Sequence, residues 1–178
     1  MAENENETGA AAPEVNAEDA PQVAMLAQYV RDLSFENPNA PASLQNESDT
    51  KPAIDVNVNV GGRKAGDDVY EVELKLTVSS KKDDQVSFVV ELSYASLFGI
   101  RNVPEEAIGQ IMLIQAPTLM FPFARRIIAD AVRDGGFPPL MLDPISFEAL
   151  YRQQAEQAAA EGGAAADGAD VSESITVN

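Results

Sequence analysis

The residues that could carry out chemistry in this chain of 178 residues are limited by what the sequence lacks. It contains no Cys, no His and no Trp. Without Cys or His there is no thiolate nucleophile, no imidazole general base and no zinc site built from those ligands. Catalysis would have to use carboxylates, Tyr or Lys alone. The sequence therefore excludes Ser-His-Asp and Cys-His enzymes.

Adjacent carboxylates are the side chains nearest in type to a general acid–base pair or a Ca²⁺ site. They occur at Asp67–Asp68 and Asp83–Asp84, both in polar stretches where Asp favours turns. The segment Gly61-Gly62-Arg63-Lys64 is basic and glycine-rich but lacks the spacing of a phosphate-binding loop. We therefore predict no catalytic residue, no metal site and no cofactor.

The charge of the chain is strongly negative and unevenly distributed. Twelve Lys and Arg stand against 29 Asp and Glu, for a net charge of -17. Residues 1–20 hold six acids and no base, and residues 151–178 hold five acids and one Arg, so ten of the 17 charges lie at the two ends. A protein that binds nucleic acid needs excess cations to displace counterions from phosphate. We expect no nucleic-acid partner.

Composition divides the chain into three parts. Residues 1–20 form an acidic N-terminal tail, 21–155 a folded domain, and 156–178 an acidic tail rich in Ala and Gly. Both tails have few large apolar side chains and are predicted to be disordered. No signal sequence is visible, and no apolar run approaches the roughly 20 residues of a membrane helix. We expect a cytoplasmic protein without membrane insertion.

The first half of the domain shows the alternation of strands. It predicts strands over about 23–35, 54–60, 70–78 and 87–94, with Gly61-Gly62 ending the second. Short polar connections between consecutive strands predict an antiparallel meander.

The second half shows helical spacing. A helix is predicted from Pro104, and Pro117 interrupts it. Thr118 is the candidate N-cap of a second helix that ends at Gly135-Gly136, and Asp143-Pro144 is predicted to open a last one. Strands followed by helices predict an α+β fold, in which helices pack on one face of a four-stranded antiparallel sheet.

The alternation also predicts two different sheet faces. The apolar face contains Leu33, Phe35, the even-numbered residues of the third strand, and Phe88, Val90, Leu92 and Tyr94 of the fourth. The opposite face gathers acids that only Lys75 offsets among the strand residues, namely Asp32, Glu36, Asp55, Glu71, Glu73 and Glu91. An ordinary solvated face is the alternative interpretation.

Three further segments, 96–100, 119–123 and 137–142, are richer in large apolar residues than connections require. We expect part of this surplus to pack in the core and part to line a groove or an oligomer interface.

Four motifs, in order from about Tyr29 to Gln154, resemble the bacterial protein-export chaperone family SecB. They are RDLSFENPNAP at 31–41, DVYEV at 68–72, LMFPFAR at 119–125, and GFPPL with LDPISF at 136–147. A Trp that some members carry in the loop after the first motif is absent, and residues 46–51 are polar.

The resemblance implies a homotetramer built as a dimer of dimers, without enzymatic activity. It implies a cytosolic, ATP-independent holdase that keeps precursor proteins unfolded for export and delivers them to the SecA ATPase.

The motif match also implies roles for single residues. Acids of the sheet surface receive SecA in this family, and the matching acids here are Asp32, Glu36 and Glu91. Val89 matches the apolar residue that precedes Glu91 in the family's apolar-x-Glu pattern. We expect a client groove lined by Leu44, Leu97, Phe98, Phe121, Phe137, Leu140, Met141 and Phe147. Val90, Leu92 and Tyr94 are assigned to packing and assembly.

Two other functions remain open from the sequence. One is a SecB-like chaperone dedicated to another client, such as a toxin. The other is a small α+β enzyme with an enclosed pocket, which would be a monomer or dimer with a buried carboxylate of shifted pKa.

Overall fold

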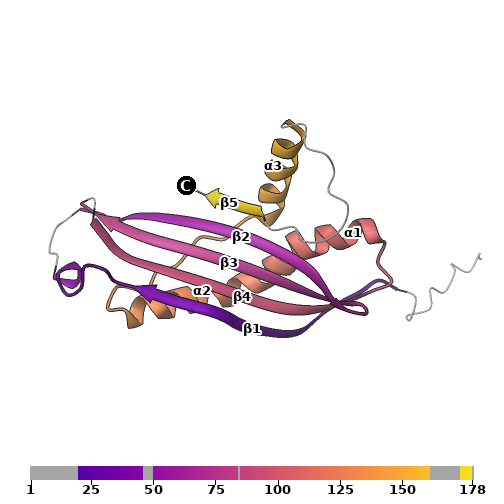
Figure 1. Ribbon diagram of the computed structural model, residues 1–178, viewed down its shortest axis with the longest axis horizontal. Coiled ribbons are helices and arrows are strands. Elements are labelled where there is room, and N and C mark those ends of the chain that lie inside the picture. The colour runs from indigo at the N-terminus through magenta and orange to yellow at the C-terminus, as the bar shows by residue number, and fades with distance from the viewer. Residues whose placement is uncertain (1–19, 46–49, 84, 161–172, 178) are drawn as a thin grey trace, which may run out of the picture.

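The computed structural model describes residues 20–45, 50–83, 85–160 and 173–177. Its main feature is an antiparallel sheet of four long strands, β1 (Gln22–Glu36), β2 (Ala53–Gly66), β3 (Val69–Lys82) and β4 (Gln85–Arg101) (Figure 1). Strands β2, β3 and β4 form the expected meander, and β1 pairs with the far edge of β4. The α+β fold with a four-stranded antiparallel sheet is confirmed.

The strands are longer than the alternation alone predicted. Strand β2 does not end at Gly61-Gly62, because these glycines pair in register with Glu73 and Val72. Gly62 instead allows a close approach, since a Cβ there would lie 3.0 Å from the Sδ atom of Met112 in the helical layer. The prediction that the strand ends at these glycines was wrong because Gly can serve packing as well as turns.

Strand β4 likewise continues through Ser96–Ile100, which the sequence placed after the last strand. The turns that follow β2 and β3 contain Asp68 and Asp83, whose φ angles are 55° and 51°. Asp tolerates this left-handed conformation better than most residues. The predicted turns are confirmed at Asp67–Asp68 and at Asp83, while Asp84 lies outside the described residues.

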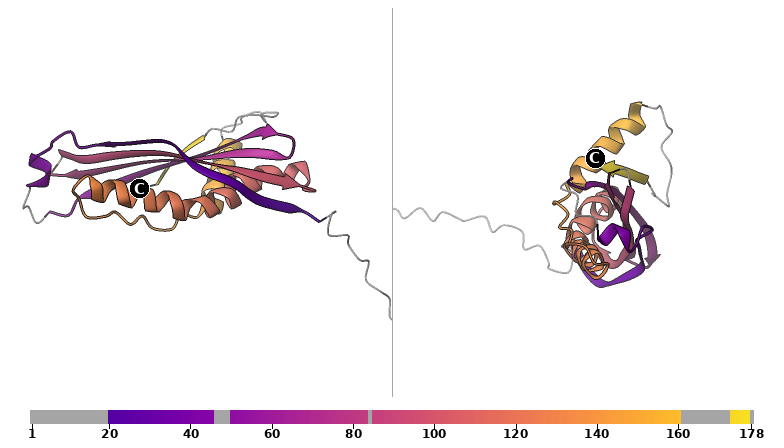
Figure 2. Two further views of the ribbon diagram at one scale, coloured as in Figure 1. Left: turned by 90° about the horizontal axis from the view of Figure 1, so that it is seen from below. Right: turned by 90° about the vertical axis from the view of Figure 1, so that its left-hand side faces the viewer.

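One helical layer covers one face of the sheet (Figure 2). Helix α1 (Glu105–Gln110), the π-helical segment η2 (Ile111–Gln115) and helix α2 (Ala116–Asp134) follow one another without a break. Pro117 lies in the first turn of α2 and does not interrupt the helix, because the proline follows a turn with a different hydrogen-bond pattern. Thr118 donates its hydroxyl to the Ile114 carbonyl oxygen at 2.6 Å, so its prediction as an N-cap was wrong.

Helix α3 (Phe147–Ala160) begins later than predicted. The backbone N–H of Ala149 donates to the Ser146 hydroxyl oxygen at 3.3 Å, so Ser146 takes the N-cap position expected of Asp143. A short strand, β5 (Glu173–Val177), pairs antiparallel with β2 from Val56 to Val60. The tail predicted to be disordered over 156–178 contains the end of α3, as far as Ala160, and β5. Its other residues, and residues 1–19 of the predicted N-terminal tail, lie outside the described part of the chain.

The core lies between the helical layer and the sheet. It contains the predicted apolar residues Val90, Leu92 and Tyr94 of β4, all buried. From the helical side it receives Met120, Ala124, Ile128 and Val132 of α2, at the spacing of one helix face. Burying each large apolar side chain contributes roughly 1.5–3 kcal/mol.

The helix formed by α1, η2 and α2 spans Glu105–Asp134, and its length and composition would allow it to cross a membrane. The sequence predicts no membrane helix, because no apolar run approaches roughly 20 residues. One helix of this kind is weak evidence, since the core helix of a soluble protein meets the same criteria. Here Met120, Ala124 and Ile128 pack against the sheet.

Candidate partner and client surfaces

The sheet face opposite α1 and α2, here called the outward face, carries the predicted partner residues. Asp32 lies beside Ser93, Glu91 pairs with Ser34, and Glu36 pairs with Val89. Residues opposite one another on paired strands project to the same side. The structure therefore brings Asp32, Glu36, Val89 and Glu91 together along the β1–β4 pair.

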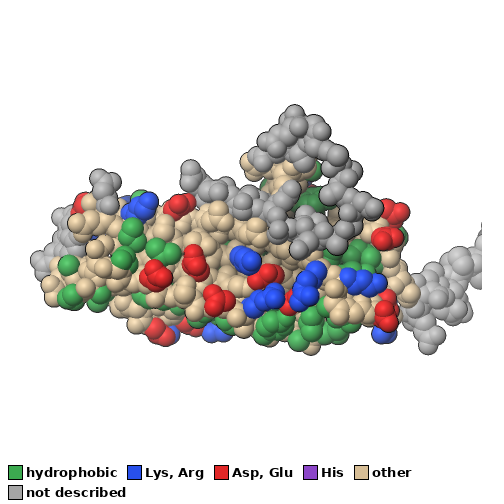
Figure 3. Space-filling model, in the orientation of Figure 1, with side chains coloured by type: hydrophobic (Ala, Val, Ile, Leu, Met, Phe, Trp, Pro, Cys, Tyr) green, Lys and Arg blue, Asp and Glu red, His purple; other side chains and the backbone are tan. Residues whose placement is uncertain are grey.

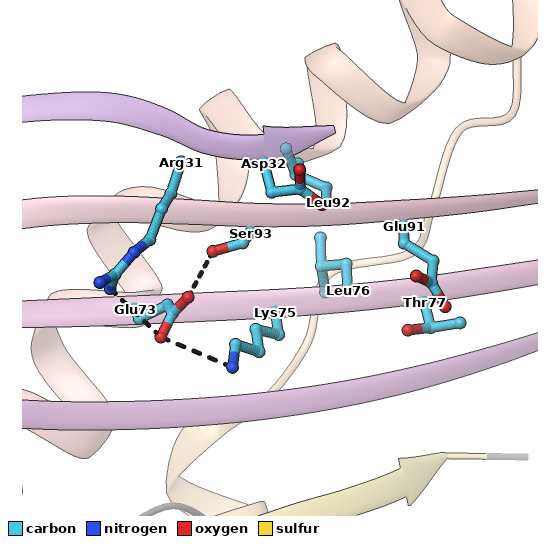
Figure 4. Close-up of a pocket in the computed structure, with 9 residues that line it drawn as sticks. All are labelled: Arg31, Asp32, Glu73, Lys75, Leu76, Thr77, Glu91, Leu92 and Ser93. Atoms are coloured by element: carbon cyan, nitrogen blue, oxygen red, sulfur yellow. Dashed lines mark hydrogen bonds and ion pairs between the residues drawn. The ribbon is translucent and has the colours of Figure 1, made fainter. Parts of the chain in front are cut away.

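An open hollow of about 370 Å³ marks part of this region (Figure 4). Its lining includes Asp32 from β1, Glu91 and Ser93 from β4, and Glu73 from β3. Neither Asp32 nor Glu91 forms a salt bridge with another residue in the described part of the chain. Both carboxylates are exposed and free to meet cations of a partner.

Cations also reach this face, in a group that we call the cation cluster: Arg31, Arg63 and Lys75. The Arg31 Nη1 atom lies 3.6 Å from the Glu73 Oε2 atom, and the Lys75 Nζ atom lies 3.7 Å from the same oxygen. Arg63 forms an ion pair with Glu71. The prediction that only Lys75 offsets the acids was therefore wrong.

Two local features bring the extra cations there. The register of β1 against β4 shifts between Val30 and Asp32, and Arg31 joins Asp32 in lining the hollow. Arg63 belongs to β2 and pairs with Glu71 because the strand continues beyond its glycines. Extending the alternation of residues 54–60 across those glycines would have placed Arg63 with Asp55. Figure 3 shows acidic and basic side chains side by side on this face.

Glu71 is the buried member of this network, with 5% of its surface exposed. The Tyr29 hydroxyl donates a hydrogen bond to the Glu71 Oε1 atom, and the Arg63 guanidinium contacts the Oε2 atom. The hydrogen bond from Tyr29 is the main cause that lowers the pKa of Glu71; burial opposes it, and Arg63 lowers the pKa further. The same hydrogen bond is the main cause that raises the pKa of Tyr29. An ionised Glu71 thus connects β1, β3 and β2.

A cavity of about 490 Å³ lies at one end of the sheet and is mainly apolar. It is bounded by the 3-10 turn η1 (Ala42–Leu44), strand residues Ile54 and Phe88, and the segment after α2. Three predicted groove residues, Leu44, Phe137 and Leu140, meet in its lining. We call this cavity the client groove.

Aromatic packing shapes the wall of the client groove. The Phe88 and Phe137 ring centroids lie 5.0 Å apart, and Phe35 stacks on Phe88 at 5.8 Å. Ile54 and Phe88 were missed as groove residues because their alternation assigned them to the core face. Their position near the ends of the predicted strands could have indicated that they border a groove.

The other five predicted groove residues lie elsewhere. Phe98, Phe121 and Phe147 are buried in the core, where the Phe121 and Phe147 centroids lie 6.1 Å apart. Phe98 points inward because its segment is part of β4 and keeps the alternation. Leu97 is half-buried opposite Glu71 on the outward side, and Met141 is exposed but does not line the cavity. Burial in the core contradicts the predicted groove role of Phe98, Phe121 and Phe147, whereas Leu97 and Met141 remain accessible outside the cavity.

The outer edge of β1 is a second apolar surface. Within the described residues β1 pairs only with β4, so its other edge keeps free backbone groups. Its exposed apolar residues are Val23, Leu26, Tyr29, Val30 and Leu33, and Leu119 and Phe123 of α2 are also exposed. Long edges of this kind pair readily with another chain.

Comparisons with known proteins agree on one family. A family model described as "SecB: Preprotein translocase subunit SecB" matches residues 16–158. A relative from Rhizorhabdus wittichii named "Protein-export protein SecB" is 58% identical, over 85% of this chain and 90% of its own length. One of the same name from Sphingopyxis alaskensis is 52% identical, over 88% and 89%.

A solved structure shares the fold. It is the Mycobacterium tuberculosis SecB-like chaperone in complex with a ChAD peptide from an antitoxin, which superposes with a TM-score of 0.59. The sequence identity is 13%, and the match covers 69% of this chain and 90% of that one.

Proposed function

The chain belongs to the SecB family of protein-export chaperones, and on that premise we propose that it is an ATP-independent holdase. It keeps precursor proteins unfolded in the cytoplasm and delivers them to the SecA ATPase. The proposal assigns no catalytic residue and no cofactor. The observation that carries it is the client groove, where Leu44, Phe137 and Leu140 form an open apolar lining.

Groove chemistry supports the binding of many unfolded sequences. An unfolded client exposes apolar side chains, and their burial contributes roughly 25 cal/mol per Å² without reading sequence. Leu44 has 49% of its surface exposed and can therefore contact a client without rearrangement of the core. Aromatic and aliphatic walls accept side chains of different shapes.

Assembly would turn weak single contacts into stable capture. We propose that the chain assembles into a homotetramer, a dimer of dimers. Its interfaces are formed by the β1 edge and by the exposed apolar residues Leu119 and Phe123 of α2. Several grooves on one particle can hold several segments of the same client, so that avidity raises the affinity.

The second partner is SecA, at the acidic end of the outward face. The open carboxylates of Asp32, Glu36 and Glu91 favour a basic protein segment, and Val89 adds an apolar contact between them. Release of the client then needs no ATP on the chaperone, because SecA binding supplies the free energy.

Client affinity of groove variants tests the holdase proposal. A fluorescently labelled unfolded precursor is titrated with the wild-type protein and with Leu44→Asp, which places a charge in the client groove. We expect affinity to fall about tenfold, the order expected when an apolar contact is replaced by a buried charge. Met141→Asp, at an apolar and exposed position outside the cavity lining, is the matched control. Equal affinity of the wild type and Leu44→Asp contradicts the proposed groove.

A chaperone dedicated to a toxin is the alternative. The structural neighbour bound to an antitoxin peptide shares 13% identity, whereas relatives at 52–58% identity are named as export proteins. Those relatives favour export. Capture of unfolded precursors from cell extract, compared with capture of a toxin–antitoxin pair, decides between the two clients.

A further inference from the structure

A second hollow adjoins the acid-lined hollow on the outward face. Its volume is about 270 Å³, and the two hollows share Arg31, Glu73 and Lys75. Figure 4 labels these three residues in the acid-lined hollow. The remaining lining residues come from β2 and β3, and they are Asn59, Gly61, Gly62, Arg63 and Glu71. Acidic and cationic hollows therefore lie side by side on one surface.

The cations of the second hollow are more exposed to solvent than its acids. The side chains of Arg31, Arg63 and Lys75 are 45%, 59% and 58% exposed, whereas those of Glu71 and Glu73 are 6% and 23% exposed. Three cations therefore stand against two carboxylates, and the cations form the outer layer. Gly61 has no side chain to fill the space between them.

Within the described residues, Arg63 contacts Glu71, whereas Arg31 and Lys75 donate no hydrogen bond to the carboxylates beside them. The Arg31 Nη1 atom lies 3.6 Å and 3.8 Å from its two carboxylate neighbours, and the Lys75 Nζ atom lies 3.7 Å from Glu73. These separations allow Coulomb attraction but exceed hydrogen-bond length. The carboxylates accept hydrogen bonds from other groups, since Glu71 accepts from Tyr29 and Glu73 accepts from Ser93. The N–H groups of Arg31 and Lys75 therefore remain available.

We propose that this hollow is a carboxylate-binding subsite of the partner surface. The inference rests on the proposed function, in which a basic partner segment binds Asp32 and Glu91. It adds that the same segment carries an acidic side chain, which binds the cation cluster. The occupant is thus a protein segment of mixed charge.

The sheet register limits the spacing of the two charges in that segment. Glu91 lies opposite Thr77, Lys75 is two residues along β3 from Thr77, and Glu71 beside Arg63 is six residues along. At about 3.4 Å per residue, these separations are about 7 Å and 20 Å. An extended segment needs its carboxylate two to six residues from its basic side chain. Because the basic and acidic side chains of the segment must each meet the opposite charge, the segment can bind in only one direction.

Two synthetic peptides test the subsite. Both are extended segments with a Lys-Arg pair; in one, a Glu follows four residues later, and in the other a Gln replaces it. Calorimetry with the wild-type protein should show the Glu peptide binding about 3- to 10-fold more tightly, as expected for about 1 kcal/mol from a partly exposed ion pair. In Arg31→Gln/Lys75→Gln, which keeps the Arg63–Glu71 pair, the two peptides should bind within twofold of each other.

The matched control is Lys51→Gln/Lys64→Gln, which removes the same charge at two exposed residues outside the hollow. It should keep the difference between the peptides. Equal binding of the two peptides to wild type overturns the subsite, as does a difference that survives in Arg31→Gln/Lys75→Gln. If the peptides bind equally but Asp32→Lys weakens both, the proposed function stands and only the subsite fails. If neither peptide binds, the subsite and the proposed partner role of Asp32 and Glu91 are both overturned.

Discussion

The carboxylates of the outward face fall into two kinds that differ in their neighbours. Glu71 and Glu73 lie under cations and accept hydrogen bonds from Tyr29 and Ser93. Asp32 and Glu91 have no salt-bridge partner among the described residues and border an open hollow. The first pair stabilises the sheet, and the second is available for another protein.

Charge reversal of the open pair should separate the two proposed activities. We predict that Asp32→Lys combined with Glu91→Lys abolishes SecA binding, because two attractive contacts become repulsive, and that client holding is kept. Calorimetry at moderate salt measures the SecA affinity. Glu105→Lys/Glu106→Lys, the same charge change on α1, is the control and should retain binding. Unchanged SecA affinity in the first variant would refute the assignment.

The Tyr29–Glu71 hydrogen bond should make stability depend on pH. The folded-state pKa of Glu71 is lowered, so its ionised form adds stability above the unfolded pKa, and this stability is lost as the pH falls through the folded pKa. Tyr29→Phe removes the main cause of the lowering. We expect the free energy of unfolding to fall by about 1–2 kcal/mol at pH 7, and by less in acid.

Thermal unfolding at fixed protein concentration, at pH 7 and at acidic pH, measures this difference. Tyr70→Phe, on the same face as the core and half-buried, is the control and should show little change at either pH. A Tyr29→Phe defect that stays constant down to acidic pH would show that Glu71 is not the linked group.

At the level of residues, the sequence predicted more of the acidic face than of the groove. Alternation alone placed Asp32 and Glu91 outward, because a strand that is buried on one side leaves little freedom of register. Arg63 was missed because the strand was predicted to end at Gly61-Gly62, and a glycine pair can indicate close packing as well as a turn. Phe121 and Phe147 were misplaced because an apolar side chain does not reveal whether it meets the core or the solvent.

At the level of elements, the junction between α2 and the client groove depends on one glycine. A Cβ at Gly135 would collide with the ring of Phe35, which stacks on Phe88. We predict that Gly135→Ala displaces Phe35, lowers the free energy of unfolding by roughly 1–3 kcal/mol and weakens client binding. Gly109→Ala in α1 is the control, because a Cβ there meets nothing within 4 Å.

Chemical denaturation and client titration are the measurements for this pair. The control Gly109→Ala should leave the free energy of unfolding unchanged or raise it, because Ala stabilises a helix by about 1 kcal/mol relative to Gly. If Gly135→Ala is as stable as wild type, Phe35 moves without cost and the aromatic wall is not rigid.

Element boundaries were the least predictable part of the fold. The order and type of the strands and helices followed from periodicity, but Pro117 and Ser146 changed where the helices begin. Several neighbouring residues could have served as the first-turn proline or as the N-cap, so the sequence does not single out the position at which a helix begins. The pairing of β1 with β4 is set by long-range packing, which no local pattern encodes.

At the level of the whole molecule, exposed apolar surface should drive assembly. Leu119 and Phe123 are 53% and 43% exposed on α2, away from the core. We predict that Leu119→Asp/Phe123→Asp converts a tetramer into a smaller species, because the two new carboxylates of each chain cannot be buried in an interface without cationic partners. Sedimentation measures the mass, with Met141→Asp as the control. A wild type that sediments as a monomer would contradict the assembly.

The client groove, the open acids and the exposed apolar surfaces are the features on which the proposed holdase function depends. The central claim is that this chain holds proteins in an unfolded state. Light scattering of an aggregating unfolded precursor, with and without the chain at one tetramer per client, tests this most directly. We predict that wild type suppresses the scattering and that Leu44→Asp suppresses it less. Scattering that is unchanged by the wild-type chain would contradict the account.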